Sequence, residues 1–236
     1  MKLGIMQPYF FPYVGYFQLI HAVDRYIFFD TTQYEKKGRW MNRNRIFNIK
    51  EGSTYITVPV ENAPLGTALK DTKIDDSKDW RGQILAQLDI YRKRAPFYTE
   101  VINLVKEVFT YSGSNLSQLN INAIIAVCEY LSLPFDYNIF SEMDLEIPKE
   151  SKKDEWALNI TKALGYTEYI NSPGGKTFYS KDKFSEHGIT LQFLEPELKQ
   201  YEQKIGRYEP GLSIIDVLMF NNIKETNAML ESYNFA

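Results

Sequence analysis

The sequence predicts an α/β protein with a short parallel sheet, a β-hairpin insertion and a helical middle region. Three observations predict this class. Apolar runs at residues 2–6 and 25–30 flank a helix-like run over 12–23. Two runs with strand character follow, at 40–47 and 54–60. Helical spacing then dominates the middle third, and strand and helix patterns alternate to the end, which is typical of α/β folds.

The amino-terminal elements each have a local justification. Leu3 to Met6 is an apolar run of strand length. Pro12 suits the first turn of a helix, where its missing N–H has no partner to lose. Residues 25–30 form the second strand, and two strands joined through a helix are expected to be parallel, with a right-handed crossover. Residues 50–53 read as the turn of the hairpin.

The rest of the chain is predicted from caps and periodicity. Ser77 or Asp79 caps a helix from about Trp80 to Arg94, and Ser213 caps another. Further helices follow from apolar residues at three- and four-residue spacing. The expected helices are 101–109, 116–131, 152–164, 214–219 and 223–233, and the expected strands are 73–75, 135–140, 166–171 and 188–193. Residues 177–179 are expected to form a short strand or a turn.

Composition limits the class of partner. The chain has 236 residues and a net charge of −3, which favours a single domain, 1–236, and gives no reason to expect nucleic acid or an anionic membrane as a partner. No run approaches the length of a membrane span. The one cysteine, Cys128, lies in an apolar run, and neither His21 nor His187 has a second metal ligand at a suitable spacing. We expect a cytoplasmic protein without a metal site that acts on a small molecule.

An aromatic turn follows the first strand. Six of the nine residues from Tyr9 to Phe17 are aromatic. In open α/β sheets ligands bind at such a strand-to-helix turn, and a glycine there lets a ligand approach closely. The predicted substrate-binding residues of this turn are Gln7, Tyr9, Tyr13, Gly15 and Tyr16. The alternative is an aromatic mini-core in which the glycine serves packing.

A basic segment covers Lys36, Lys37, Arg39 and the run from Asn42 to Arg45. In a strand, Asn42 and Asn44 share one face, and Arg43 and Arg45 share the other. Two arginines can hold a phosphate or carboxylate by paired hydrogen bonds. We therefore predict that Asn42, Arg43, Asn44 and Arg45 bind substrate. The alternative is a charged, solvated hairpin edge.

Two further segments are candidates. The turn Ser172–Lys176 contains Gly174, Gly175 and Lys176, which can bind phosphate through backbone N–H groups and the ammonium, although it is not a Walker A sequence. A plain loop is the alternative. Asp30 and Gln33 follow the second strand, and we predict Asp30 as a general base and Gln33 as a substrate contact. Asp24 and Asp216 are weaker acid–base candidates. The alternative, for Asp30 as well, is a helix cap or an ion-pair partner, since most carboxylates in such places have that role.

The quoted residues carry a resemblance. Met6 to Ile20 resembles the start of the WbqC-like family, and the similarity continues almost to the end of the chain. The other matching segments are Asp30 to Tyr34, Asn42 to Arg45, Thr57 to Val60, Tyr169 to Gly175 and Leu212 to Asp216. The family is associated with bacterial surface polysaccharide, particularly O-antigen, gene clusters. The resemblance therefore implies work on an activated sugar or on its acyl or aminoacyl decoration, and it assigns no catalytic residue.

A second similarity concerns the sheet. The strand, loop, helix and strand plan resembles the Rossmann-like fold of nucleotidylyl transferases and of AMP-forming ligases such as pantothenate synthetase. Those enzymes bind phosphates with an H-x-G-H motif at the first helix start. The segment from Tyr13 to Tyr16 stands there in this chain, with tyrosine at both histidine positions. Tyrosine brings no positive charge at neutral pH.

Three functions follow as hypotheses. The first is a transferase that modifies a nucleotide-activated or amino sugar, using a nucleotide-sugar or acyl donor. The second is an AMP-forming ligase with a nucleotide as cofactor. The third is a non-catalytic scaffold in a glycan assembly complex. The first requires the aromatic turn to line an open cavity together with Arg43 and Arg45.

Overall fold

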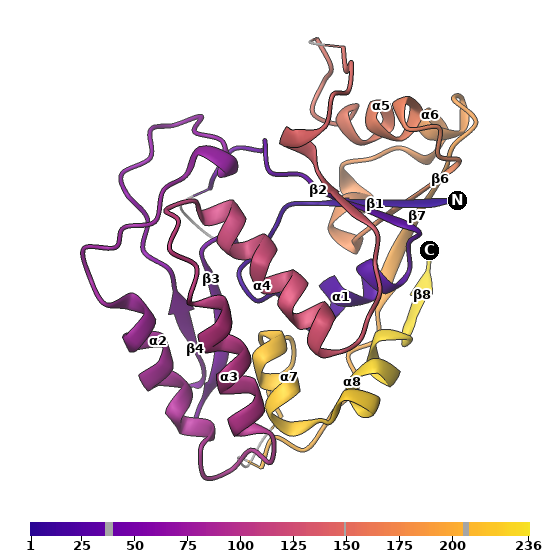
Figure 1. Ribbon diagram of the computed structural model, residues 1–236. Helices are drawn as coiled ribbons and strands as arrows, with labels where there is room; N and C mark the ends of the chain where they lie inside the picture. Colours follow the sequence, from indigo (N-terminus) through magenta and orange to yellow (C-terminus); the bar gives the residue numbers. More distant parts are fainter. Residues whose placement is uncertain (36–39, 149, 205–207) are drawn as a thin grey trace.

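The computed structural model describes residues 1–35, 40–148, 150–204 and 208–236. The basic residues Lys36, Lys37 and Arg39 of the predicted anion-binding segment lie outside these ranges. The chain forms a mixed α/β fold, with a mostly parallel central sheet and a separate antiparallel hairpin (Figure 1).

The central sheet has six strands in the order β5-β2-β1-β6-β7-β8. β1 pairs in parallel with both β2 and β6, and β8 is antiparallel to β7. The strands are β1 (Lys2–Met6), β2 (Arg25–Phe28), β5 (Tyr137–Ile139), β6 (Glu168–Asn171), β7 (Thr190–Pro196) and β8 (Tyr233–Phe235). From the centre of the sheet, the strands thus follow in chain order β1, β2 and β5 toward one edge and β6, β7 and β8 toward the other.

Helices cover both faces of this sheet, which is why its inner strands read as continuous apolar runs. One face packs against α1 (Val14–His21) and α8 (Ile223–Leu230), which contact each other. The other face buries Leu3 and Ile5 against α5 (Trp156–Ala163) and α6 (Lys181–Ser185). Figure 1 shows the sheet between these layers, with α5 and α6 above it and α1 and α8 below.

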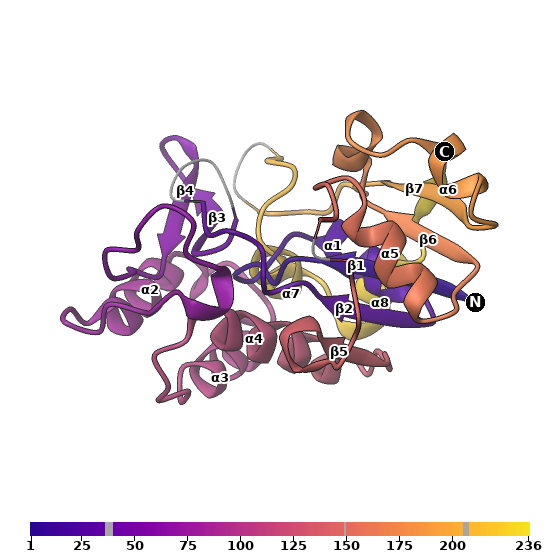
Figure 2. The same cartoon turned by 90° about the horizontal axis from the view of Figure 1, so that it is seen from above.

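The hairpin lies apart from the sheet, beside the ends of its strands (Figure 2). It pairs β3 (Arg43–Asn48) with β4 (Gly52–Thr57), from Arg43 opposite Thr57 to Asn48 opposite Gly52. Gly52 has φ of 83°, a left-handed conformation that favours glycine after a three-residue hairpin loop. Asn44, Ile46 and Ile56 face the core.

The helical middle region packs against the hairpin. It contains α2 (Trp80–Leu88), α3 (Tyr98–Val108) and α4 (Leu116–Tyr130), and α7 (Ile214–Phe220) lies against both α3 and β3. Asp79, Asn115 and Ser213 accept backbone hydrogen bonds as N-caps. Short 3-10 helices are η1 (Leu69–Asp71), η2 (Asp89–Tyr91), η3 (Phe140–Glu142) and η4 (Pro173–Thr177). Among the described residues, no helix is long and apolar enough to cross a bilayer.

Several predicted boundaries are wrong for tertiary reasons. Pro12 precedes α1 instead of opening it, because its carbonyl accepts the backbone N–H of Ile214 at 2.9 Å. The predicted helix over 223–233 ends at Leu230, and the chain then adds β8 to the sheet. At 177–179, where the sequence predicts a short strand or a turn, the structure has the turn: η4 ends at Thr177, and Phe178 stands in a turn after it.

Candidate functional site

Three of the predicted segments share one edge of the central sheet. Gln7 follows β1, Asp30 lies two residues after β2, and the turn with Gly174 to Lys176 follows β6. Since β2, β1 and β6 are adjacent and parallel, their carboxyl ends meet at the same edge. The outward direction of the chain reverses between β1 and β6, and such a reversal opens a crevice between neighbouring loops.

The aromatic turn after β1 divides into a buried and a half-buried part. Tyr16 is buried, its hydroxyl donates to the backbone carbonyl of Gln7 at 2.9 Å, and burial raises its pKa well above the ordinary value. Tyr9 and Gln7 are half-buried, and the Tyr9 hydroxyl donates to Gln7 Oε1 at 2.7 Å. Gln7 and Tyr9 therefore remain partly accessible at the sheet edge, whereas Tyr16 is a core residue.

Gly15 has a packing role in α1. A Cβ there would lie 2.5 Å from the ring of Tyr13, which folds back over the start of the helix. Tyr13 is half-buried, and burial raises the pKa of its hydroxyl. The ring thus occupies the space that the missing side chain leaves.

The centre of the aromatic turn is strained and tightly held. Phe11 has φ of 39°, an uncommon conformation for a bulky residue, and both Phe10 and Phe11 are fully buried. The Asn44 amide donates to the carbonyls of Phe10 at 3.1 Å and Phe11 at 2.8 Å. Such strain persists only when the surroundings enforce it, and it is concentrated at functional sites.

Two tethers of this turn were not predicted from the sequence. The buried amide of Asn120 donates to the carbonyls of Pro8 and Met41, at 2.9 and 2.6 Å. Ser213, predicted only as a helix cap, also donates its hydroxyl to the Phe11 carbonyl at 2.7 Å. Asn120 follows Leu116 by four residues and so lies on the apolar face of the expected helix. A polar residue on that face was the sequence pattern that could have indicated a buried hydrogen-bonding role.

Asp30 lies at the carboxyl end of β2, as predicted, and is 3% exposed. Its carboxylate accepts hydrogen bonds from the backbone N–H of Ser141 at 3.0 Å and from the Ser141 hydroxyl at 2.5 Å. Asp30 therefore joins β2 to η3 at the site edge. Gln33, farther along the same loop, is exposed and pairs through its backbone with Ala68.

The glycine turn after β6 contains two different glycines. A Cβ at Gly175 would lie 3.0 Å from the Asn171 side chain, so packing accounts for this glycine. A Cβ at Gly174 would meet nothing closer than 4.0 Å, so the fold itself leaves this position open. Lys176 forms an ion pair with Glu195 at the end of β7.

The hairpin residues divide as the strand alternation predicts. Asn44 is buried, while Arg43 and Arg45 are half-buried on the opposite face. Arg45 lies 3.4 Å from the Glu209 carboxylate. Arg43 forms no ion pair within the described ranges, and its guanidinium lies 4.6 Å from the centre of the Tyr55 ring. Asn42 donates to the Val58 carbonyl at 2.9 Å. Of Arg43, Arg45 and Lys176, only Arg43 is thus without a carboxylate partner in the described part of the chain.

The other acid–base candidates have structural partners. Asp24 accepts the backbone N–H of Lys2 at 2.7 Å, at the opposite edge of the sheet. Asp216 is fully buried and accepts hydrogen bonds from the hydroxyls of Tyr91 and Tyr201 and from the Gln203 amide. Burial raises the pKa of the Asp216 carboxyl, and these hydrogen bonds partly oppose that rise.

Asp216 should make stability depend on pH. Its carboxyl has a raised pKa in the folded state, so between the unfolded and folded pKa values the folded state binds more protons, and stability falls as pH rises. The free energy of unfolding of the wild type minus that of Asp216→Asn should therefore increase as pH falls from 7 toward the ordinary carboxyl pKa of about 4, by at most about 1.4 kcal/mol per pH unit. Urea denaturation of both proteins measures this difference, and a flat or opposite dependence contradicts it.

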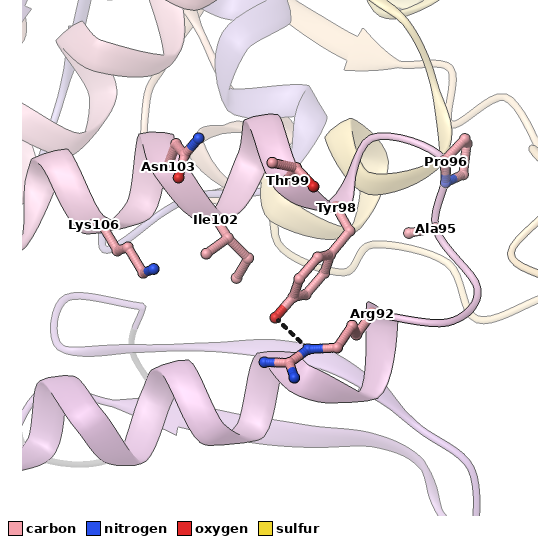
Figure 3. A pocket seen from close by; sticks show the side chains of 8 residues that line it. All are labelled: Arg92, Ala95, Pro96, Tyr98, Thr99, Ile102, Asn103 and Lys106. Atoms are coloured by element: carbon pink, nitrogen blue, oxygen red, sulfur yellow. Dashed lines mark hydrogen bonds between the residues drawn. The ribbon is translucent and has the colours of Figure 1, made fainter.

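A separate hollow of about 470 Å³ lies along α3 (Figure 3). None of the predicted site residues lines it. Of the two cations that line it, Arg92 pairs with Asp89 at 2.9 Å, and Asp89 also accepts a hydrogen bond from the Tyr98 hydroxyl at 2.6 Å. Within the described ranges, no group of three or more His, Cys, Asp or Glu side chains could hold a metal ion.

Comparison with known proteins gives one family and one relative. The sequence model of the WbqC-like protein family matches residues 7–228. An uncharacterized protein of Mycobacterium tuberculosis, Rv1507c, is 30% identical over 223 residues, which cover 93% of each chain. No solved structure matches the chain. The matched range includes the sheet edge, the hairpin and α7.

Proposed function

The chain belongs to the WbqC-like protein family, and from this premise and the geometry of the sheet edge we propose that it is a transferase. Its substrate is a nucleotide-activated or amino sugar of bacterial surface polysaccharide synthesis, to which it adds an acyl or aminoacyl group. The observation that carries the proposal is the meeting of Gln7, Asp30 and the Gly174 turn at the carboxyl ends of three adjacent parallel strands.

The strand order supports a nucleotide-binding role. The parallel strands run β5-β2-β1-β6-β7, an order that corresponds to 3-2-1-4-5 in Rossmann-like sheets. In such sheets the crevice at the reversal binds the nucleotide. Gly174 supports the same role, because the space above it admits a phosphate close to the backbone.

Each residue has a proposed task. Gln7 and Tyr9 orient the sugar through neutral hydrogen bonds, Arg43 holds the phosphate, and Asp30 is the general base that accepts a proton from the sugar amine or hydroxyl. The Tyr16 hydroxyl donates its hydrogen bond to the Gln7 carbonyl. Because an AMP-forming ligase would use this position to bind ATP, the contact favours a transferase.

The first test is binding. We expect calorimetry to detect a nucleotide sugar, and Arg43→Gln to weaken that binding at least tenfold, because a charge-assisted hydrogen bond contributes about 1.5–3 kcal/mol. Arg94→Gln is the matched control, since Arg94 is exposed and, among the described residues, its guanidinium donates only to the Ile90 carbonyl in its own turn.

The outcomes separate the hypotheses. Binding that Arg43→Gln and Arg94→Gln affect equally removes Arg43 from the site. Binding of ATP with release of AMP supports the ligase instead, and binding of a nucleotide sugar without turnover of any acyl or aminoacyl donor supports a scaffold.

A further inference from the structure

Four side chains on the outer face of the hairpin form a cation–aromatic ladder, defined here as Arg43, Tyr55, Trp40 and Arg45. The Arg43 guanidinium lies 4.6 Å from the centre of the Tyr55 ring. The Tyr55 and Trp40 rings are stacked, with centroids 6.3 Å apart and planes 28° apart. The Arg45 guanidinium lies 6.0 Å from the centre of the Trp40 ring.

The aromatic pair of the ladder is accessible. Arg45 and Tyr55 are opposite each other in the β3–β4 register, on the side away from the buried Ile46 and Ile56. Trp40 is 36% exposed and Tyr55 is 43% exposed. Five Phe, Tyr and Trp side chains of the described residues are exposed, and Trp40 and Tyr55 are the two of these that stack on each other, so the pair offers a surface against which a ring can pack.

The charge of the ladder is only partly compensated. Arg45 lies next to Glu209 and also donates to the carbonyls of Pro210 and Gly211, each at 3.4 Å. The Arg43 guanidinium has no hydrogen bond or ion pair to any other residue in the described part of the chain. The Arg43 guanidinium over the Tyr55 ring therefore keeps N–H donors that can bind two oxygens of one anion.

The ladder touches the loops that follow β1 and β2. The Phe10 backbone N–H donates to the Trp40 carbonyl at 3.0 Å. The backbone of Trp40 thus joins the ladder to the aromatic turn after β1. Burial raises the pKa of the Tyr34 hydroxyl, four residues after Asp30, and the charge of Arg43 opposes this rise.

We propose that the ladder binds an anionic group attached to a ring, with the phosphate on Arg43 and the ring against Trp40 and Tyr55. Tyr55 is then a positioning residue for Arg43, and Trp40 supplies ring preference. The inference rests on the proposed function in that it places one end of the same substrate. The ring is either the sugar or the base, since a sugar phosphate and a nucleotide share this chemistry.

Calorimetry with four probes tests it: UDP-glucose, glucose 1-phosphate, inorganic pyrophosphate and glucose. We expect the three anions to bind and glucose not to bind. Arg43→Gln and Tyr55→Ala should weaken every anion at least fivefold, whereas Tyr55→Phe, which keeps the ring, should bind like the wild type. Trp40→Ala should weaken the two ring phosphates but not pyrophosphate. The stronger of the two ring phosphates identifies whether base or sugar occupies the ladder.

The failures are distinguishable. If the ring phosphates bind Tyr55→Ala and Trp40→Ala as tightly as they bind the wild type, or if no anion binds the wild type at millimolar concentration, the ladder is structural and the inference is overturned. A nucleotide sugar that still binds and turns over in those variants leaves the proposed transferase standing. Binding that depends on the ladder, without turnover of any donor, supports the inference and contradicts the transferase.

Discussion

Asp30→Asn should lower turnover by about 10²–10⁴-fold while the nucleotide sugar still binds, because the variant removes a general base and little else. The structure makes this substitution unusually clean. Asparagine Oδ1 can still accept the Ser141 backbone N–H, and the new amide group can donate to the Ser141 hydroxyl, so the contact between β2 and η3 survives. The readouts are the initial rate with the donor that binds, and the dissociation constant.

Ser141→Ala is the matched control for this experiment. It removes the hydroxyl contact to Asp30 and keeps the carboxylate. If Asp30 acts as a base, Ser141→Ala should retain most of the activity that Asp30→Asn loses. A full rate in Asp30→Asn shows that the carboxylate has no chemical role. An equal loss in both variants shows that Asp30 acts only through the geometry of η3.

The sheet was predictable because its inner strands are locally distinctive. β1 and β2 are short, mostly apolar runs with buried central residues, and such runs can be read from the sequence. β8 was not predictable. It has three residues, and it follows a helix without a break in the pattern. It is defined by its pairing with β7, and Gln18 of α1 also donates to the Met229 and Ser232 carbonyls that precede it. Contacts between distant segments cannot be read from periodicity.

The candidate site was predictable in position but less so in detail. That Gln7, Asp30 and the Gly174 turn share an edge follows from parallel strands alone. The sequence does not predict which of the three cations is free to bind an anion. Lys176 pairs with Glu195 and Arg45 pairs with Glu209, and both glutamates lie in segments that no sequence pattern links to these cations. The role of Asn44 could not be predicted either. The sequence alone does not distinguish an asparagine that binds a ligand from one that binds a backbone carbonyl.

Asn44→Ala should lower the free energy of unfolding by about 3 kcal/mol. The side chain makes three hydrogen bonds: its amide donates to the Phe10 and Phe11 carbonyls, and its oxygen accepts the Arg45 backbone N–H at 2.8 Å. Each buried polar group left without a partner costs about 1–3 kcal/mol. The Phe11 carbonyl keeps the Ser213 hydroxyl, which limits the loss. Urea denaturation at neutral pH measures the change.

The matched control is Asn42→Ala, two residues earlier and on the same face of the chain. Asn42 is half-buried and makes one such bond, to the Val58 carbonyl, so its replacement should cost about 1 kcal/mol. Asn44→Ala should also weaken nucleotide-sugar binding, because Phe11 can then leave its strained conformation and the turn that carries Gln7 and Tyr9 loses its position. Equal losses of stability in the two variants would mean that Asn44 does not enforce the strain. A stable Asn44→Ala protein with lost binding would return Asn44 to the role of a direct substrate contact.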